Sequence, residues 1–357
     1  MTSIRRSVRD YESWLAERLG DAFVKSDLKT KHQIMRDSPF GFLRATYWRW
    51  AETVLEACPE LADTPAVLAV GDIHLENFGT WRDAEGRLVW GVNDFDEAAE
   101  MPFVLDLLRL ATSALLARRA GLMGAAAICN AILTGYRAGL KAPEALVIDE
   151  DWRWMRQEFV VSEAARTKFW KKMQLLARSR PHREPPSRFM RVLERAVPEP
   201  PLPMHVAPRG AGAGSRGRLR LVGLADWRGG QLVREVKAAL PSGWLLAQGH
   251  RAGPLHIKAI AGGRYRCPDP WFDVHGDVIV RRLSPNNRKI ETDHGLPEIL
   301  RPRMLEAMGF ELANIHRSAS DRAPLRDSLR GLPRGWLPTA ARRMAKVVTR
   351  DFRAFAG

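Results

Sequence analysis

Nine carboxylates fall within residues 71–106 of a 357-residue chain whose formal net charge is +15. Only two arginines, Arg82 and Arg87, lie in the same stretch. Neighbouring carboxylates raise one another's pKa and cost stability unless a cation joins them. A hard divalent cation such as Mg²⁺ suits Asp and Asn oxygens, so this segment predicts a magnesium site. The nine are Asp72, Glu76, Asp83, Glu85, Asp94, Asp96, Glu97, Glu100 and Asp106.

The rest of the composition narrows the class of protein. Lys and Arg number 56 against 41 Asp and Glu, an excess that favours anionic partners such as phosphates, nucleotides or nucleic acid. Three scattered cysteines support neither a disulfide framework nor a zinc site. No apolar run approaches the roughly 20 residues that span a bilayer, and the N-terminus has no signal-like apolar region. We expect a cytoplasmic protein without a membrane span.

The first half of the chain predicts helices with two short strands. Residues 1–65 form an N-terminal helical segment, with Ser38 capping a helix that has Pro39 in its first turn. In residues 66–180, apolar runs at 67–70 and 88–92 predict buried strands. Helical spacing resumes from Leu105 and again from Ala125. The acidic segment therefore begins where the first strand ends.

The second half changes character. Prolines crowd residues 181–208, which predicts an irregular crossing. Residues 209–290 predict a small β-containing lobe, and residues 291–357 predict C-terminal helices that return to the first part. The expected strands are 218–225 and 231–239, joined by a hairpin turn at 226–230, and 278–280; the expected helix is 303–317. The fold class is therefore α+β, with a helical lobe first and a smaller β-containing lobe second.

The spacing of the acidic residues points to a chemistry. Asp72 and Asn77 lie five residues apart directly after one strand, and Asp94 follows the next strand. Kinase-type phosphoryl transfer uses an Asp that accepts the acceptor's proton, an Asn five residues on that binds Mg²⁺, and a later Asp that holds the metal. Positioning and charge neutralisation supply most of such catalysis. The pattern therefore favours a phosphotransferase.

The same residues carry a resemblance to known families. The runs Gly-Asp-Ile-His-Leu-Glu-Asn-Phe-Gly at 71–79 and Asn-Asp-Phe-Asp-Glu at 93–97 resemble the signature of the bacterial domain of unknown function 2252. Residues 38–44 and 106–111 also match that pattern. The catalytic residues resemble the aminoglycoside phosphotransferase and choline kinase group, which has a protein-kinase-like two-lobe fold. This resemblance implies that Asp72 is the catalytic base, that Asn77 and Asp94 bind Mg²⁺, and that Asp106 supports the catalytic loop.

Each of these residues has a structural alternative. Asp72 and Asn77 are also turn-forming residues. His74 is either a catalytic proton-transfer group or a hydrogen-bonding brace of the loop. Asp96 is either a further metal ligand or an exposed carboxylate. Asp106 starts a helical pattern, so it is also a candidate N-cap.

A phosphate-binding loop is expected downstream. Gly212, Gly214 and Gly217 form a G-x-G-x-x-G run, and a strand follows where a dinucleotide-binding fold would have a helix. Lys237 on the next strand is placed to reach nucleotide phosphates. Because kinases have these parts before the catalytic loop, we expect a circularly permuted kinase-like fold. This hypothesis requires Lys237 to lie close to Asp94.

Two features depart from the kinase pattern. No Glu occurs between Lys237 and residue 291, so the usual carboxylate partner of that lysine is replaced by Gln248, Glu100 or another carboxylate of the first part. Glu235 alternates with Lys237 along the strand and shares its face. Either an unusual nucleotide pocket or a loss of nucleotide binding is therefore expected.

Positive charge is concentrated opposite the acidic segment. Residues 205–265 contain ten Lys and Arg against Asp226 and Glu235, and residues 168–172 form a second basic run with two aromatics. We expect an ATP- and Mg²⁺-dependent phosphotransferase that acts on a hydroxyl acceptor the sequence does not name. The alternatives are nucleotidyl transfer, a nucleotide-binding pseudokinase without turnover, and, less favoured, a nucleic-acid-binding protein.

Overall fold

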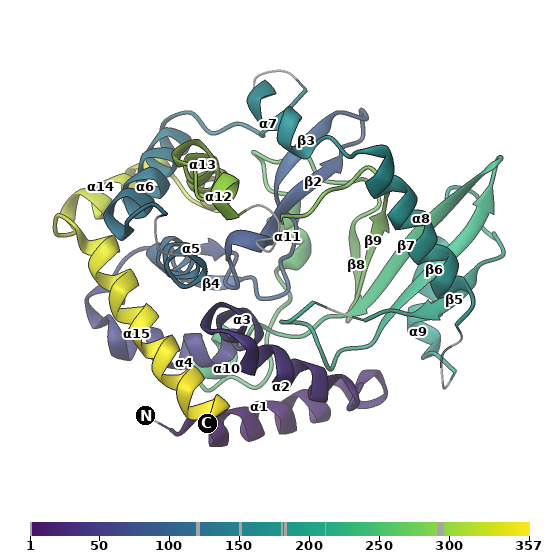
Figure 1. The fold of residues 1–357 in the computed structure, drawn as a ribbon, viewed down its shortest axis with the longest axis horizontal. Helices are drawn as coiled ribbons and strands as arrows, with labels where there is room; N and C mark the ends of the chain where they lie inside the picture. Colours follow the sequence, from purple (N-terminus) through teal and green to yellow (C-terminus); the bar gives the residue numbers. More distant parts are fainter. Residues whose placement is uncertain are drawn as a thin grey trace.

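The protein is described by a computed structural model that covers residues 2–118, 122–149, 152–179, 181, 184–210, 212–290 and 296–357. A helical part and a five-stranded antiparallel sheet lie side by side (Figure 1), and the chain also forms two small β-ladders. The α+β prediction is confirmed. The helical part takes its helices from both ends of the chain.

The helices of this part match the sequence expectations closely. Ser38 caps its helix through its hydroxyl, which accepts a hydrogen bond from the amide of Gly41 at 3.0 Å, and Pro39 is the first helical residue. The helices are α1 (Ile4–Leu19), α2 (Asp27–Asp37), α3 (Pro39–Ala45), α4 (Tyr47–Ala57), α5 (Val104–Ala117), α6 (Ala125–Lys141), α7 (Arg153–Phe159), α12 (Leu296–Ile299), α13 (Pro302–Ala319), α14 (Arg322–Gly331) and α15 (Trp336–Ala356). The short helices α10 (Gly243–Ala247) and α11 (Ile257–Ala261) follow the large sheet's third strand.

Helices α6 and α13 cross at very short range in the core. A Cβ on Gly309 would lie 2.1 Å from the carbonyl oxygen of Ile132, and a Cβ on Gly135 would lie 1.8 Å from that of Glu306. No side chain fits at either point, so the two backbones touch there. This contact fixes α13, whose last turn carries His316 toward the candidate site.

Two antiparallel ladders hold the acidic segment. Strand β1 (Ala66–Ala69) pairs with β4 (Ala99–Pro102), and β2 (Phe78–Arg82) pairs with β3 (Leu88–Val92). The chain passes from β1 to β2 through residues 70–77, and from β3 back to β4 through residues 93–98. Because both connections join the same two ladders, they must run beside each other. Topology therefore brings Asp72 and Asn77 next to Asp94 and Asp96.

The second part of the chain builds the larger sheet. Its strands run in the order β5-β6-β7-β9-β8, all antiparallel to their neighbours. The hairpin between β6 and β7 is tighter than expected, since Trp227 pairs with Gly230 and only Arg228 and Gly229 form the turn, both at positive φ. The strands are β5 (His205–Pro208), β6 (Arg220–Trp227), β7 (Gly230–Ala238), β8 (Asp273–His275) and β9 (Val278–Leu283).

One helix covers each face of this sheet. Helix α8 (Glu163–Ala177) packs Met173 against Val222, Leu224 and Val233, while α9 (Ser187–Arg195) lies on the opposite face, where Leu193 approaches Gly223 (Figure 1). Cross-strand partners share a face, so Glu235, which pairs with Val222, lies on the α8 side together with Lys237. The α8 face is thus apolar at one end and charged at the end that meets the acidic loops.

The prediction of an irregular crossing over residues 181–208 is wrong in part. Helix α9 and strand β5 both lie within it, and β5 forms an edge of the sheet. Pro185 and Pro186 stand just before α9, where a missing amide donor costs nothing, and Pro181 lies further upstream of that helix. The remaining prolines fall between α9 and β5 or at the end of β5. In a sequence, prolines that cluster at the ends of helices and strands form the same pattern as a proline-rich linker, and this is why the prediction failed.

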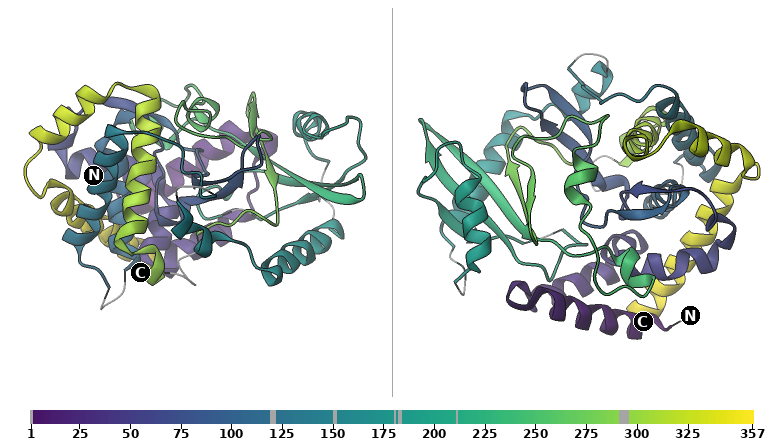
Figure 2. Two further views of the ribbon diagram at one scale, coloured as in Figure 1. Left: turned by 90° about the horizontal axis from the view of Figure 1, so that it is seen from above. Right: turned by 180° about the vertical axis from the view of Figure 1, so that it is seen from behind.

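The two ends of the described chain meet. Arg5 Nε donates to the carbonyl of Ala354 at 3.4 Å, and Figure 2 shows both termini at the same edge of the helical part. Among the described residues, no helix is both long and apolar enough to cross a membrane.

The crossing of α6 and α13 can be tested directly. Gly309→Ala should lower the free energy of unfolding by about 1–3 kcal/mol or more, because the new methyl group collides with the backbone of α6. Chemical denaturation at a fixed temperature measures the change. Gly331→Ala, where a Cβ meets nothing within 4 Å, is the matched control and should be neutral or slightly stabilising. Equal effects of the two substitutions would contradict this packing.

Candidate active site

Three loops enclose one cavity of about 330 Å³. They are the two acidic loops, residues 70–77 and 93–98, and the glycine loop, residues 212–217. Seven of the ten residues named from the sequence as candidate site residues line the cavity: Asp72, His74, Asn77, Asp94, Asp96, Gly212 and Gly214. Basic side chains from both parts of the fold complete the wall: Arg44, Lys172, Arg209, Arg218, Arg220, Arg281 and Lys289. The cavity therefore lies between the helical part and the sheet.

Asp72 is fixed by a glycine before it and an arginine beside it. Gly71 has φ +78°, and a Cβ there would lie 2.2 Å from the carbonyl of Glu97, so the turn into Asp72 requires glycine. The guanidinium of Arg109, fully buried in α5, pairs with Asp72 Oδ1. Asp72 Oδ2 instead lies on the glycine-loop side, where a Cβ on Gly214 would be 3.3 Å away. One carboxylate oxygen is thus anchored and the other faces the glycine loop.

The protonation of Asp72 is set by opposing effects. Burial raises its pKa, Arg109 lowers it, and Glu97 and Asp94 raise it further, so that the pKa of Asp72 reaches about 7. A carboxyl group with a pKa near neutrality is suited to general acid–base work at ordinary pH. Arg109 also donates to the carbonyl of Leu43 at 2.9 Å and so ties α3 to the same point.

Asn77 and His74 brace the loop that carries Asp72. The Asn77 amide nitrogen donates to the carbonyls of Asp72 at 3.0 Å and Asp94 at 3.1 Å. Its side-chain oxygen is buried and has no hydrogen-bond partner among the described residues. His74 Nδ1 accepts a hydrogen bond from the amide of Glu76 at 3.1 Å, and burial followed by nearby Arg44 lowers its pKa well below the usual range. This geometry favours the bracing alternative for His74.

Asp106 supports the same loop from α5. Its two oxygens accept from the amides of Val70 at 2.7 Å and Gly71 at 2.9 Å, and His316 Nε2 lies 3.1 Å from Oδ2. Asp106 is fully buried and stands in the first turn of α5, which begins at Val104. The N-cap alternative for Asp106 is therefore wrong: its carboxylate binds loop amides rather than the helix's own first amides.

Lys237 reaches across the cavity to both carboxylates of the second loop. Its Nζ lies 3.0 Å from Asp94 Oδ1 and 2.5 Å from Asp96 Oδ1. Burial opposes the charge of Asp94, but Lys237, Lys289 and Arg281 outweigh it and hold the pKa of Asp94 well below its usual value. The missing carboxylate partner of Lys237 is thus supplied by the first part of the chain, whereas Gln248 and Glu100 are exposed.

Asp96 and its neighbour Glu97 connect the loop to the sheet. Arg218 donates to Glu97 at 2.9 Å and lies 3.6 Å from Asp96, while the amide of Gly243 donates to Glu97 at 2.6 Å. Asp96 is shielded at the cavity wall, with its side chain 11% exposed, so the exposed-carboxylate alternative is wrong. These contacts join residues that are more than 120 positions apart in sequence.

Glu235 organises an arginine cluster on the sheet. Its carboxylate is fully buried and pairs with Arg220 at 2.9 Å, Arg281 at 2.6 Å and also Arg209. Burial alone would raise the pKa of Glu235, but the three guanidinium groups lower it strongly. Three arginines share one carboxylate, so the cluster keeps a positive charge beside Lys237. The unusual pocket expected from Glu235 is an arginine-rich wall.

The three glycines of the G-x-G-x-x-G run have different positions. Gly212 and Gly214 line the cavity, and Gly214 lies against both Asp72 and the carbonyl of Arg44. Gly217 does not line it; it has φ +94° and sits against Leu15 of α1. The first two glycines are therefore available for a ligand, and the third is a structural turn.

The residues present fit a divalent cation in part. No group of three or more His, Cys, Asp or Glu side chains is arranged for a metal ion within the described ranges. The unpartnered oxygen of Asn77 and the carboxylate of Asp94 are nevertheless hard oxygen ligands that share one cavity. Lys237 supplies the positive charge at Asp94 and Asp96 in this structure.

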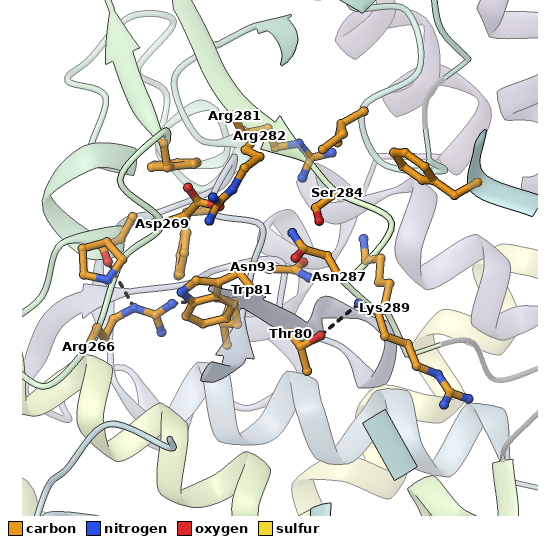
Figure 3. A pocket seen from close by; sticks show the side chains of 18 of the residues that line it. Thr80, Trp81, Asn93, Arg266, Asp269, Arg281, Arg282, Ser284, Asn287 and Lys289 are labelled. Atoms are coloured by element: carbon orange, nitrogen blue, oxygen red, sulfur yellow. Dashed lines mark hydrogen bonds and ion pairs between the residues drawn. The ribbon is translucent and has the colours of Figure 1, made fainter. Parts of the chain in front are cut away.

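A second cavity of about 370 Å³ adjoins the first and shares Arg209, Arg281 and Lys289 with it (Figure 3). It lies between β2 and β3 on one side and the segment after β9 on the other, so that Trp81 faces Ser284 and Asn287 across it. Four aromatic side chains line it: Trp81, Phe95, Phe169 and Phe272. The two cavities together form one elongated site with an aromatic end and an acidic end.

The basic run at 168–172 belongs to this site. Phe169 lines the second cavity, Lys172 lines the first, and Trp170 packs beside the Met173 cluster on the sheet. The aromatic side chains are thus turned toward the protein, which leaves them poorly placed for stacking on nucleic-acid bases.

Several site residues escaped the sequence analysis. Arg109 stands one helical turn after Asp106, so the i, i+3 spacing on α5 could have indicated that both face the acidic loop. Arg44 lies within the 38–44 run but had no assigned role. Lys289 and Arg281 gave no local signal, because only the pairing of distant segments places them at the cavity.

The fold and the site define an α+β protein with an acidic loop pair facing a basic sheet. Residues 23–199 match the model of the DUF2252 family, described as an uncharacterized protein conserved in bacteria. The matched segment contains both acidic loops and Asp106, and it ends before the glycine loop. Searches of curated proteins and of solved structures give no match.

The raised pKa of Asp72 predicts a pH-dependent stability. Below about pH 4 both folded and unfolded states keep the proton; as pH rises to about 7 only the folded state keeps it, so wild-type stability falls across this window. Asp72→Asn removes the titration. The variant should therefore gain stability relative to wild type between pH 4 and pH 7, as measured by urea denaturation. Parallel curves for the two proteins would contradict a raised pKa.

Proposed function

We propose that this protein is an ATP- and Mg²⁺-dependent phosphotransferase of kinase-like fold that acts on a hydroxyl acceptor. The observation that carries the proposal is the meeting of Lys237 with Asp94 at 3.0 Å in a cavity that also contains Asp72 and the glycine loop. These four features are the recurring parts of kinase-type phosphoryl transfer. They come from opposite halves of the chain and converge on one point.

The larger sheet supports a kinase-like small lobe. The glycine loop joins its first two strands, β5 and β6, and Lys237 lies on its third, β7, where kinases carry the phosphate-binding lysine. Asp96 takes the place of the carboxylate that kinases supply to this lysine from a helix. The segment after β9 then leads back toward the helical part, as a hinge between lobes would.

The order of the parts supports a circular permutation. Helix α13 ends beside the acidic loop, with His316 on Asp106, although it follows that loop by more than 200 residues. The two chain ends lie together at the surface, which is the arrangement that permits permutation. In this proposal the chain starts in the large lobe, crosses to the small lobe, and returns.

Each site residue then has a role. Asp72 Oδ2 accepts the proton of the acceptor hydroxyl, while Arg109 holds Oδ1 and fixes the direction of the carboxylate. Lys237 and the arginines around Glu235 bind donor phosphates, and Gly212 and Gly214 let backbone approach them.

The metal would be held by Asn77 and Asp94. Mg²⁺ held there would neutralise phosphate charge, and Asp94 would then bind the metal in place of Lys237. The aromatic second cavity has the size and character to take a nucleobase, since it opens onto the phosphate-binding wall through Arg209 and Arg281.

Nucleotide binding is the first test. Mg-ATP at about 100 times its Kd should stabilise the protein by roughly 2.7 kcal/mol in thermal or chemical unfolding. Asp94→Asn, which keeps the shape but removes the charge, should abolish the Mg²⁺-dependent part of that stabilisation. ATP without Mg²⁺, with a chelator present, is the control. No stabilisation of the wild-type protein by Mg-ATP would contradict the proposal.

Turnover is the second test. Asp72→Asn should reduce phosphoryl transfer, or slow ATP hydrolysis in the absence of an acceptor, by at least about 100-fold while Mg-ATP affinity is retained. Asp63→Asn, at an exposed position outside the cavity, is the matched control and should leave turnover unchanged. Equal turnover in Asp72→Asn and wild type would remove Asp72 from the base role. Binding without any turnover in the wild type would favour the pseudokinase alternative.

A further inference from the structure

We propose that the acceptor is a phosphate monoester, whose phosphate binds to Arg44 and Lys289 beside Asp72. This inference rests on the proposed phosphotransferase function and specifies the class of its second substrate. It follows from the distribution of paired and unpaired charges in the first cavity.

The cavity offers no unpaired carboxylate to a cationic acceptor. Every acidic side chain that lines it already has a basic partner among the described residues. The pairs are Asp72 with Arg109, Glu76 with Arg44, Asp94 with Lys237, Asp96 with Lys237 and Arg218, and Glu97 with Arg218. A cationic alcohol would have to displace one of these partners. An amine-bearing acceptor is therefore disfavoured.

Cations, by contrast, are in excess. When the lining side chains are counted with the buried groups paired to them, Lys237, Arg109 and Glu235, nine basic groups face six carboxylates. A nucleoside triphosphate with its Mg²⁺ has a net charge of about −2, so the cavity stays positive after it binds. Basic groups that remain in excess repel one another in a partly enclosed cavity, and this repulsion is costly unless a further anion binds there. About one positive charge then remains, and a phosphate monoester, which carries −1.5 to −2 near neutral pH, more than offsets it.

The positions of two cations define where that anion binds. Arg44 lies at the end of α3, and its carbonyl and Asp72 Oδ2 both lie within about 3.3 Å of the Cβ position of Gly214. Lys289 pairs its backbone with Gly79, two residues after Asn77, and the amide of Ile290 donates to the carbonyl of Phe78 at 3.1 Å. Arg44, which pairs with Glu76, and Lys289 are therefore both held beside the loop that carries Asp72.

Lys289 is also available for a ligand. Lys289 is an exposed residue of the cavity wall, burial of its amino group lowers its pKa to about 8, and no ion pair or side-chain hydrogen bond joins it to another described residue. Arg44 has one bond to Glu76 and a buried Nε without a hydrogen-bond partner in the described part of the chain. The sheet arginines, which are fixed around Glu235, are instead placed for the donor. Lys289 lines both cavities together with Arg209 and Arg281, but those arginines are paired with Glu235 and Lys289 is not, and this difference in pairing separates their proposed roles.

The test uses the full chain saturated with Mg²⁺ and a non-hydrolysable ATP analogue. Glycerol 3-phosphate, titrated by calorimetry, should bind to this loaded protein, whereas glycerol should not. Lys289→Gln should weaken glycerol 3-phosphate binding by roughly tenfold or more and change the affinity for the ATP analogue by less than about twofold, because a charged hydrogen bond is lost only at the acceptor position. Lys29→Gln, an exposed lysine of α2 outside the cavity, is the matched control.

Each result is decisive for one proposal. If the loaded protein does not bind glycerol 3-phosphate, or if the ester only displaces the ATP analogue, the acceptor proposal is overturned and the phosphotransferase proposal stands. If Lys289→Gln weakens the ATP analogue instead, Lys289 serves the donor and the acceptor proposal is overturned. If the wild-type protein fails to bind the analogue at all, the phosphotransferase proposal is overturned and the acceptor proposal with it.

Discussion

The ion pairs between Lys237 and the carboxylates of Asp94 and Asp96 are the contact on which the site depends. Two carboxylates held this close repel each other, and the repulsion must be offset by a positive group. Lys237 supplies this positive charge from strand β7 of the sheet, and Arg218 forms a further ion pair with Glu97. The sheet and the helical part are thereby joined across the cavity. The carboxylates of Asp94, Asp96 and Glu97 are thus neutralised by Lys237 and Arg218, which come from the second part of the chain.

The second constraint is the rigidity of the loop that carries Asp72. Gly71 permits a turn that no other residue would allow, Asp106 binds the two amides before Asp72, and Arg109 anchors one of its oxygens. Burial then raises the pKa of Asp72 to about 7 in spite of Arg109. Position and protonation of this carboxylate therefore follow from the same buried surroundings. Hydrogen bonds fix where it points, and desolvation sets when it ionises.

Much of the local structure could be predicted, since it depends on short-range patterns. The helices at residues 4–57 and 302–319, the strands at 66–69 and 88–92, and the β6–β7 hairpin were expected from periodicity and turn residues. The Pro-rich stretch was misread because proline marks the ends of α9 and β5 as readily as it marks a linker. The role of Asp106 as a loop brace came from family resemblance, since its helical position by itself suggested a cap.

The sequence by itself determined which side chains are available: the acidic loops, the glycine run and Lys237 are all legible as motifs. It did not determine which other side chains surround these motifs. Arg109, Arg44, Lys289 and the three arginines around Glu235 come from six separate elements or loops, and only strand pairing and helix packing bring them to the cavity. The reason is physical: local pattern reflects interactions over a few residues, whereas the charge balance of a cavity is a sum over segments that meet only after folding.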